Sequence, residues 1–411
     1  MKHLLKSVFI LGLIVGLSSG LYSNGLNLNG NGSKAIAMGG AFVGLADDFS
    51  AVFWNPAGLT QMEEPNLAIF ATDIIPTPTY RFPLLGIDTE AKSEHHFSGA
   101  LGFFKPLSDK VVVGIYGYIP SGVSVEWPGA DLALLSGGVA YQWNAKVAII
   151  TVSPAIAFKV SDKFSLGATL NINYGLAKLK RPALGQYEED TNGVGVGATL
   201  GMLYKPSEKF SFGLTFKTPF KATLKGDATM SGAPLLGLPG MDDAERAVTW
   251  PMWVGAGIAI KPNDKLTFTA DAQYTDWKEM DIIPITFANA GWQLFFKDGA
   301  DLTLRWEDKI QVRFGVEYKV SPSFALRGGY YHDPSPSPRS TMNILIPELS
   351  YNFFTIGFGY NTNKINLDFC LEYAIGKEVE VGLFEAEPDV GMPGFHNMDI
   401  LVPNISLTFK F

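Results

Sequence analysis

Cysteine is almost absent from this sequence, and its scarcity excludes several classes of protein. Cys370 is the only cysteine among 411 residues. It cannot form an intrachain disulfide, and a zinc site built from thiolates needs several cysteines. A disulfide-stapled domain and a cysteine-rich metal protein are therefore both excluded.

Charge and long apolar runs are also scarce. Charged residues make up 18% of the chain, whereas roughly a quarter is usual in soluble domains. No basic stripe is present, which argues against a nucleic-acid partner. After the N-terminal region the longest apolar stretch, Val147 to Val160, is interrupted by Ser153 and Pro154. A spanning helix needs about 20 apolar residues, so a membrane-spanning form of this chain must be a closed barrel.

The N-terminus has the features of a secretory signal. Lys2 and Lys6 precede an apolar run from Phe9 to Leu17, and small residues follow it. We expect a signal peptide over residues 1–23, with Leu21-Tyr22-Ser23 as the cleavage region. The alternative is an uncleaved anchor, but the apolar run is short for a spanning helix.

Long stretches alternate between apolar and polar residues. The clearest are Phe164 to Tyr174, Ile310 to Val320 and Leu367 to Tyr373. One apolar face and one polar face suit a strand between lipid and a wet lumen. Strands of a soluble sandwich would alternate too, but they average about five or six residues. A run of about eleven residues matches a strand that crosses a bilayer.

Six short polar turns set the strand count. They lie at residues 105–110, 160–163, 205–209, 261–265, 320–323 and 361–364, and they contain the Pro, Asn, Asp and Ser residues that turns favour. Six turns join twelve strands, and a strand near Asn66 to Ile74 and a final strand ending at Phe411 bring the number to about fourteen. An even number places both ends on the periplasmic side. Seven longer loops then face outward, at residues 75–93, 121–145, 181–192, 227–247, 278–309, 332–350 and 376–397.

Residues 24–62 do not have a strand pattern, and their motifs carry a family resemblance. They include Gly39-Gly40-Ala41, Asp47-Asp48, Ser50-Ala51 and Asn55-Pro56-Ala57-Gly58-Leu59. In these motifs the chain resembles the FadL/TodX outer-membrane transporters of long-chain fatty acids and aromatic hydrocarbons. The Asn-Pro-Ala triplet after an acidic pair is the most specific part. The resemblance covers nearly the whole mature chain and is weakest in the outer loops.

The resemblance implies an all-β, transmembrane antiparallel barrel of 14 strands, in agreement with the count above. It implies an N-terminal hatch (plug) at residues 24–62 inside the lumen of a barrel at 63–411. The hatch and gating residues would be Gly39, Gly40, Asp47, Asp48, Asn55, Pro56 and Ala57. It also implies a kink in the third strand that opens the wall sideways. Pro120 and Gly122 are the candidates, because proline cannot donate to a sheet ladder. The alternative is that a loop begins there.

Apolar segments and inward-facing arginines are the candidate ligand contacts. The outer loops contain apolar segments at 132–139, 234–239, 282–287, 292–296 and 342–346, and exposed apolar patches often mark binding sites. The alternative is that these loops pack on one another or rest in the membrane interface. Arg313 or Arg327 could pair with a fatty-acid carboxylate, or both could belong to an internal network of salt bridges.

The sequence therefore predicts a monomeric channel in the outer membrane of a bacterial cell for passive uptake of hydrophobic compounds. Long-chain fatty acids are the expected ligands, and aromatic hydrocarbons come next. We expect no cofactor and no metal. The expected partners are the hydrophobic ligand, outer-membrane lipid and, by resemblance to other bacterial barrels, the barrel-assembly machinery, which would read the final strand ending at Phe411.

Two other functions compete with this prediction. A general porin for polar solutes would need an open lumen, which a hatch would block. An enzyme at the outer rim would use His95, His96, His332 or His396, but no G-x-S-x-G nucleophile motif accompanies these histidines.

Overall fold

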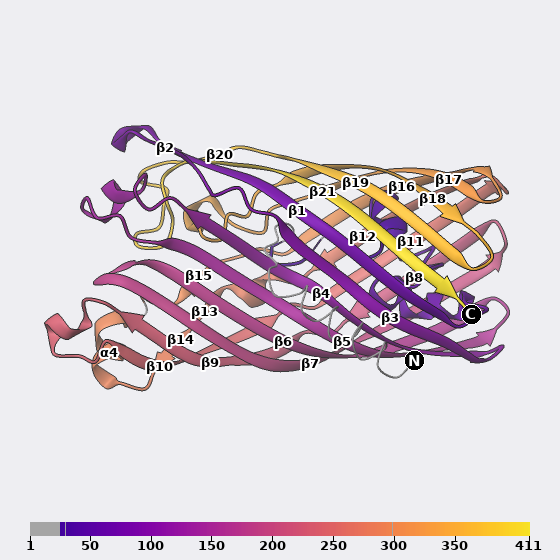
Figure 1. Cartoon of the computed structure of the whole chain (residues 1–411), viewed down its shortest axis with the longest axis horizontal. Coiled ribbons are helices and arrows are strands. Elements are labelled where there is room, and N and C mark those ends of the chain that lie inside the picture. Colours follow the sequence, from indigo (N-terminus) through magenta and orange to yellow (C-terminus); the bar gives the residue numbers. More distant parts are fainter. Residues whose placement is uncertain (1–24, 29, 298) are drawn as a thin grey trace.

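The computed structural model describes residues 25–28, 30–297 and 299–411. The expected signal peptide at residues 1–23 lies outside this part of the chain. The described residues form one elongated barrel with tilted strands (Figure 1). No helix among them is both long enough and apolar enough to cross a membrane.

Within the described residues, fourteen strands build the barrel wall. They are β1 (Asn66–Phe82), β3 (His96–Ser108), β4 (Val111–Trp127), β5 (Trp143–Ser161), β6 (Phe164–Ala183), β7 (Gly185–Ser207), β8 (Phe210–Lys217) continued by β9 (Phe220–Met230), β10 (Met241–Trp250) continued by β11 (Trp253–Asn263), β12 (Leu266–Thr275) continued by β14 (Ile285–Phe287), β16 (Lys309–Ser321), β17 (Phe324–Asp333), β18 (Tyr351–Asn361), β19 (Ile365–Gly376) and β21 (Gly394–Lys410). Pro219 separates β8 from β9 and Pro251 separates β10 from β11, because proline has no N–H for the ladder.

The remaining elements are short. Strand β2 (Ile87–Glu90) pairs with β1, β20 (Val379–Val381) pairs with β21, and β13 (Ile282–Ile283) pairs with β15 (Leu302–Thr303). The helices of the long loops are η3 (Pro83–Leu85), η4 (Ala133–Ser136), η5 (Ala233–Leu236), η6 (Trp277–Met280), α4 (Ala290–Phe296) and η7 (Arg339–Thr341).

The barrel closes where its first strand meets its last. Asn66 of β1 lies opposite Phe104 of β3 on one side and opposite Lys410 of β21 on the other. Closure leaves the wall without a free edge, so its backbone groups are hydrogen-bonded within the sheet. The predicted class, an antiparallel transmembrane barrel of about 14 strands, is confirmed.

The burial of side chains is inverted relative to a soluble protein. Along β16, Ile310 is 60% exposed and Phe314 is 51% exposed, whereas Gln311 and Arg313 are buried. Apolar side chains thus point outward and polar ones point into the lumen. An outer surface of this kind is favourable in contact with lipid and unfavourable in contact with water.

Two of the expected loops are wrong. Residues 181–192 form the ends of β6 and β7, which turn at Leu184 alone, and β9 and β10 occupy most of 227–247. Their polar residues form cross-strand ion pairs such as Lys180–Glu188 at 2.9 Å and Lys225–Glu245 at 2.8 Å. Opposite charges on facing positions stabilise a strand pair, so polar composition alone misidentified these segments as loops.

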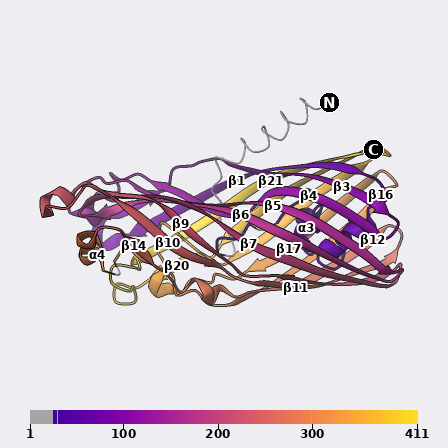
Figure 2. The same cartoon turned by 90° about the horizontal axis from the view of Figure 1, so that it is seen from below.

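The N-terminal segment lies inside the barrel. It contains α2 (Ser33–Ala37), α3 (Ala51–Trp54) and the 3-10 helix η2 (Pro56–Gln61). Helix α2 contacts β17, β18, β19 and β21, whereas η2 contacts β4, β5, β6 and β7 across the lumen. Figures 1 and 2 show this indigo segment enclosed by strands near the end that carries the short turns and the C-terminus. The residues of the expected hatch therefore fill the lumen at this end, called the turn end below.

Candidate functional site

A belt of glycines lets the barrel wall touch the N-terminal segment. At each of seven inward positions an added Cβ would collide with atoms of that segment. These positions, the glycine belt, are Gly167, Gly201, Gly213, Gly257, Gly315, Gly329 and Gly357. At Gly329, for example, the Cβ would meet the backbone of Met38 and Gly39. Only glycine permits backbones to approach this closely.

Asn55 joins the N-terminal segment to the wall. Its side-chain Nδ2 donates to the carbonyl of Val43 at 2.9 Å and to the carbonyl of Met202 in β7 at 2.9 Å. Its Oδ1 accepts from the Ala57 amide at 3.2 Å, which caps η2. Pro56 and Ala57 pack on the belt glycines Gly167 and Gly201. The asparagine-proline-alanine triplet is thus a buried attachment point.

Gly39 and Gly40 make a sharp turn against strands β16 and β17. Both have a φ of 65°, in the left-handed region that glycine adopts without strain. The Gly39 carbonyl accepts from Arg313 Nη1 at 3.1 Å, and Asp271 Oδ2 accepts from the amides of Phe42 and Val43 at 2.8 and 2.9 Å. Two buried wall charges therefore hold this turn.

The adjacent carboxyl groups of Asp47 and Asp48 have different surroundings. Asp47 forms an ion pair with Lys34 at 2.7 Å, while Asp48 accepts from the amide and hydroxyl of Ser50 at 2.8 and 2.6 Å. Burial disfavours both charges. At Asp47 the Lys34 cation outweighs burial and lowers the pKa, whereas at Asp48 burial dominates and raises the pKa to about 6.

Arg313 and Arg327 lie in separate pockets. Arg327 forms ion pairs with Glu317 at 2.7 Å and Asp368 at 2.6 Å, in a polar pocket of about 480 Å³ near the turn end. Arg313 also stacks over the ring of Tyr331 at 4.1 Å, and it lines a second cavity. Ligand contact by either residue stays a prediction, and the ion pairs leave Arg327 little capacity for it.

The second cavity, with about 740 Å³ of space that is partly open to solvent, lies on the other side of the N-terminal segment. Phe53 and Trp54 of α3 contribute to it from that segment. The wall adds four aromatic side chains, Tyr118, Phe220, Trp250 and Trp253, and a larger number of polar or charged ones, including Asn171, Asn173, Lys217, Gln273, Gln311 and Arg313. Small-molecule sites combine aromatic side chains with polar groups that fix the orientation of the ligand.

Lys217 is the residue in this cavity that sequence reasoning missed. Its Nζ lies 3.5 Å from the ring centroid of Phe53 and 4.6 Å from that of Trp253. Among the described residues, none of the ion pairs involves Lys217. The two ring faces favour the charged form of this amine, and an anion that enters the cavity would favour it further. A lysine between Phe216 and Thr218 carries no motif, so only the three-dimensional arrangement identifies it.

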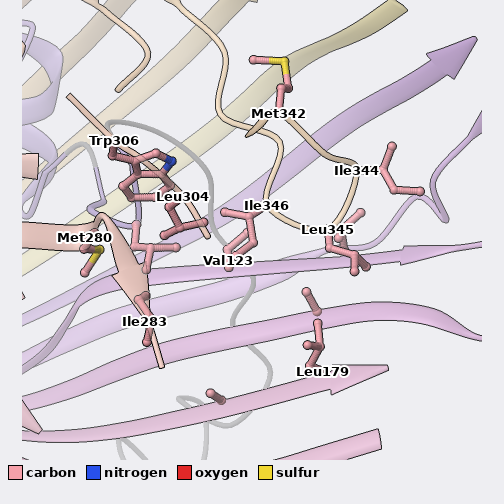
Figure 3. Close-up of a cluster of buried hydrophobic side chains, with 14 of the residues drawn as sticks. Val123, Leu179, Met280, Ile283, Leu304, Trp306, Met342, Ile344, Leu345 and Ile346 are labelled. Atoms are coloured by element: carbon pink, nitrogen blue, oxygen red, sulfur yellow. The ribbon is translucent and has the colours of Figure 1, made fainter. Parts of the chain in front are cut away.

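The loop end of the barrel is closed by a hydrophobic cluster. Figure 3 shows Met342, Ile344, Leu345 and Ile346 together with Leu304, Trp306 and the wall residues Val123 and Leu179. The indole of Trp127 donates to the Ile344 carbonyl at 2.8 Å. The apolar segment 342–346 is therefore buried packing, the alternative considered for these loops, while Leu235 and Leu236 of segment 234–239 stay exposed.

The third strand of the wall, β4, is irregular where predicted. Its pairing with β3 ends at Tyr118, and its pairing with β5 shifts register between Tyr118 and Ser121. Pro120 and Gly122 therefore lie within a strand and not at the start of a loop. Leu28 donates to the Pro120 carbonyl and Gly122 donates to the Leu26 carbonyl, both at 2.8 Å. The start of the described chain thus covers this break from the lumen.

The predicted rim histidines have separate local partners. His95 pairs with Asp73 at 2.6 Å, His332 lies 3.2 Å from Asn352 Oδ1, and His396 bonds the Met392 carbonyl at 2.8 Å. In the described part of the chain no group of three or more His, Cys, Asp or Glu residues is arranged to hold a metal.

A closed barrel with an apolar exterior, a filled lumen and an aromatic cavity defines an outer-membrane channel of the plugged kind. The chain belongs to the family described as outer membrane protein transport protein (OMPP1/FadL/TodX), whose model matches residues 14–394. Its location is the bacterial outer membrane, so the turn end faces the periplasm and the loop end faces outward.

Named relatives and solved structures agree with this assignment. The chain is 24% identical to a long-chain fatty acid transport protein of Escherichia coli O6:H1, over 89% of this chain and 90% of that one. The fold matches a Pseudomonas aeruginosa FadL homologue with a TM-score of 0.79 at 18% identity, covering 94% and 100% of the two chains. It also matches the Pseudomonas putida toluene transporter TodX with a TM-score of 0.73 at 17% identity, covering 94% and 99%.

Proposed function

We propose that this protein takes up long-chain fatty acids by passive diffusion through the cavity above the N-terminal hatch. The observation that carries the proposal is Lys217, an amine that forms no ion pair with any described carboxylate and lies among aromatic rings of the cavity. A fatty-acid carboxylate would pair with Lys217, and its chain would lie against Phe220 and Trp250. Because the cavity excludes much water, such a charge-assisted contact is stronger there than at an exposed site.

Aromatic hydrocarbons are the second candidate. The rings of Tyr118, Phe220 and Trp250 surround the same cavity, and the similar Pseudomonas putida structure is named as a toluene transporter. A hydrocarbon would use these rings and leave Lys217 without a partner, so the two ligand classes differ in their dependence on one residue.

Equilibrium binding to the detergent-purified protein tests the proposal. A labelled long-chain fatty acid should bind saturably, toluene should compete weakly, and a sugar should not compete. Lys217→Met should weaken fatty-acid binding by about tenfold, and Lys217→Arg should retain it. Displacement by toluene alone would favour the hydrocarbon. No saturable binding, together with sugar-permeable liposomes, would leave a general porin.

We propose that residues 24–62 gate this route and that ligand leaves sideways at the break in β4. Two features support this. The hatch lies between the cavity and the periplasmic pocket, and residues 26–28 cover the break through two backbone hydrogen bonds. Opening needs those contacts and the hydrogen bond between Ser121 and Asn27 to be released, and the wall beside Pro120 has already lost its pairing with β3.

The same proposal includes two partners and no catalysis. Outer-membrane lipid would solvate the apolar exterior and receive the released ligand. The barrel-assembly machinery would recognise the last strand, whose terminal Phe411 is 72% exposed. The protein acts as a monomeric channel without a cofactor or metal, and no step of this route requires a bond to break.

A further inference from the structure

Three outer loops repeat one structural device that displays leucine side chains. Each loop has a single 3-10 turn that ends at a glycine in the left-handed conformation. The turns are η3, η4 and η5, and the glycines are Gly86, Gly137 and Gly237, with φ of 68°, 66° and 71°. The segments 83–86 and 234–237 have the same sequence, Pro-Leu-Leu-Gly.

The leucines of these turns point into solvent. Leu84 is 69% exposed, Leu134 is 61% exposed and Leu235 is 83% exposed. Around the ideal Cβ position of each capping glycine no other atom lies within 4 Å, so the tips stand clear of neighbouring groups. These three residues are called the leucine tips below.

Turns η4 and η5 are held in place from beneath, whereas η3 contains no buried residue and is closed by its own backbone hydrogen bond. Leu132, next to η4, and Ala233, in η5, are fully buried, and Leu135 and Leu238 pack on the hydrophobic cluster of the loop end. The Gly237 amide donates to the Pro234 carbonyl at 3.1 Å, and the Gly86 amide donates to the Pro83 carbonyl at 3.0 Å. A leucine on an anchored turn is already positioned for contact, so burying it costs little conformational entropy.

We propose that the leucine tips insert into the surface of an uncharged oil or lipid droplet and hold the channel against it. The proposal rests on the proposed function, because a droplet is a store of the hydrophobic compounds that the cavity accepts. The leucines lie on three separate loops, with a second exposed leucine, Leu85 or Leu236, beside the tip in η3 and in η5. Small apolar tips on separate loops fit a fluid apolar phase.

The charge of the same loops determines which surface fits. Residues 83–95, 128–142 and 231–243 contain six acidic residues and one basic residue; the acidic ones are Asp88, Glu90, Glu94, Asp131, Asp242 and Asp243, and the basic one is Lys92. This net charge of −5 (one minus six) repels an anionic bilayer or lipopolysaccharide phosphates. An uncharged droplet surface has no such penalty.

Flotation of the full protein in nanodiscs with hexadecane droplets stabilised by phosphatidylcholine tests the proposal. We expect association with these droplets and less with droplets that also contain phosphatidylglycerol. The combined Leu84→Ser, Leu134→Ser and Leu235→Ser variant should lose at least about tenfold in droplet association. Leu107→Ser, at a periplasmic turn and 60% exposed in the wild type, is the matched control and should have no effect.

Three further results decide the matter. Fatty-acid binding in the cavity should be unchanged in the triple variant, which separates this proposal from the proposed function and shows that the barrel is folded. Replacement of the same leucines by phenylalanine should restore droplet association. Equal flotation of wild type and triple variant overturns the proposal, and so does self-association of the wild type in nanodiscs that the triple variant abolishes, which would make the tips a contact between copies.

Discussion

Asp48 differs from its neighbour Asp47 in that the ion pair of Lys34 is with Asp47, so Lys34 offsets the burial of Asp48 only in part, and a pH dependence follows. Burial raises the pKa of Asp48 to about 6 in the folded protein, whereas the pKa of an aspartate in an unfolded chain is about 3.9. The folded protein therefore binds a proton at Asp48 more tightly than the unfolded chain does. The stabilisation is fully present below about pH 4 and is lost as the pH rises to about 6, by at most about 3 kcal/mol.

The Asp48→Asn variant should not show this loss of stability with rising pH. The test is to measure the thermal unfolding midpoint of the purified wild type and variant between pH 4 and pH 7. Asp109→Asn, in an exposed turn, is the control. An identical pH slope in wild type and Asp48→Asn would show that Asp48 is already ionised when the hatch is seated.

The individual residues of the site were unequally predictable from sequence. Asn55 and the Gly39–Gly40 turn belong to motifs whose family resemblance singles them out, and the structure gives them buried roles. Lys217 has no motif, because its role depends on Phe53 and Trp253, which are far from it in sequence. The seven belt glycines were equally invisible, because glycine is frequent throughout the chain.

Among the elements, strands with one lipid-facing side were the most predictable. The apolar and polar residues of β6, β16 and β19 alternate because one face of each strand meets lipid and the other faces the lumen. This alternation can be recognised in the sequence of each strand alone. At the outer ends of β6 and β7 the outward positions become charged, as at Lys180 and Glu188, while inward residues such as Leu179 are apolar. The many charged residues led to these strand ends being mistaken for a loop. The burial of residues 342–346 depends on packing between distant loops and has no local sequence signal.

Neighbouring glycines on β17 offer a sharp test of the glycine belt. Gly329→Ala would place a methyl group against the hatch backbone, whereas at Gly328 the nearest atom to an added Cβ is 3.7 Å away. We expect Gly329→Ala to destabilise the protein by roughly 1–3 kcal/mol and Gly328→Ala to have little effect. Thermal unfolding of both variants checks this, and equal midpoints would mean that the hatch does not rest on the wall at this position.

The N-terminal segment at residues 26–28 that covers the break in β4 can be locked in place. Asn27 and Ser121 form an isolated bridge, and their side chains are hydrogen-bonded at 2.9 Å. A disulfide between Asn27→Cys and Ser121→Cys should abolish fatty-acid uptake into proteoliposomes without preventing ligand binding, and reductant should restore uptake. Unchanged uptake by the oxidised protein would rule out movement of this segment as a required step.

At the scale of the whole molecule, closure protects an interior thiol. Cys370 is fully buried on the lumen side of β19 and packs in the cluster that contains α2. It should resist maleimide in the folded barrel and react after heating in SDS, with Leu107→Cys in an exposed turn as a rapidly modified control. Rapid modification of native Cys370 would indicate that the hatch leaves the lumen spontaneously. In the Gly329→Ala variant we expect maleimide to modify Cys370 faster than in the wild type, because the added methyl group would displace the hatch.

The pairing of β1 with β21 has a consequence for the order of assembly. Ser33 in the hatch donates its amide to the hydroxyl of Ser406 at 2.9 Å, so residues synthesised near the beginning of the chain meet residues of its final 17-residue strand. The wall cannot close until that strand pairs with β1, and the contact between the hatch and Ser406 cannot form before it does. A chain that ends before β21 therefore lacks both the closing strand and one of the contacts that hold the hatch.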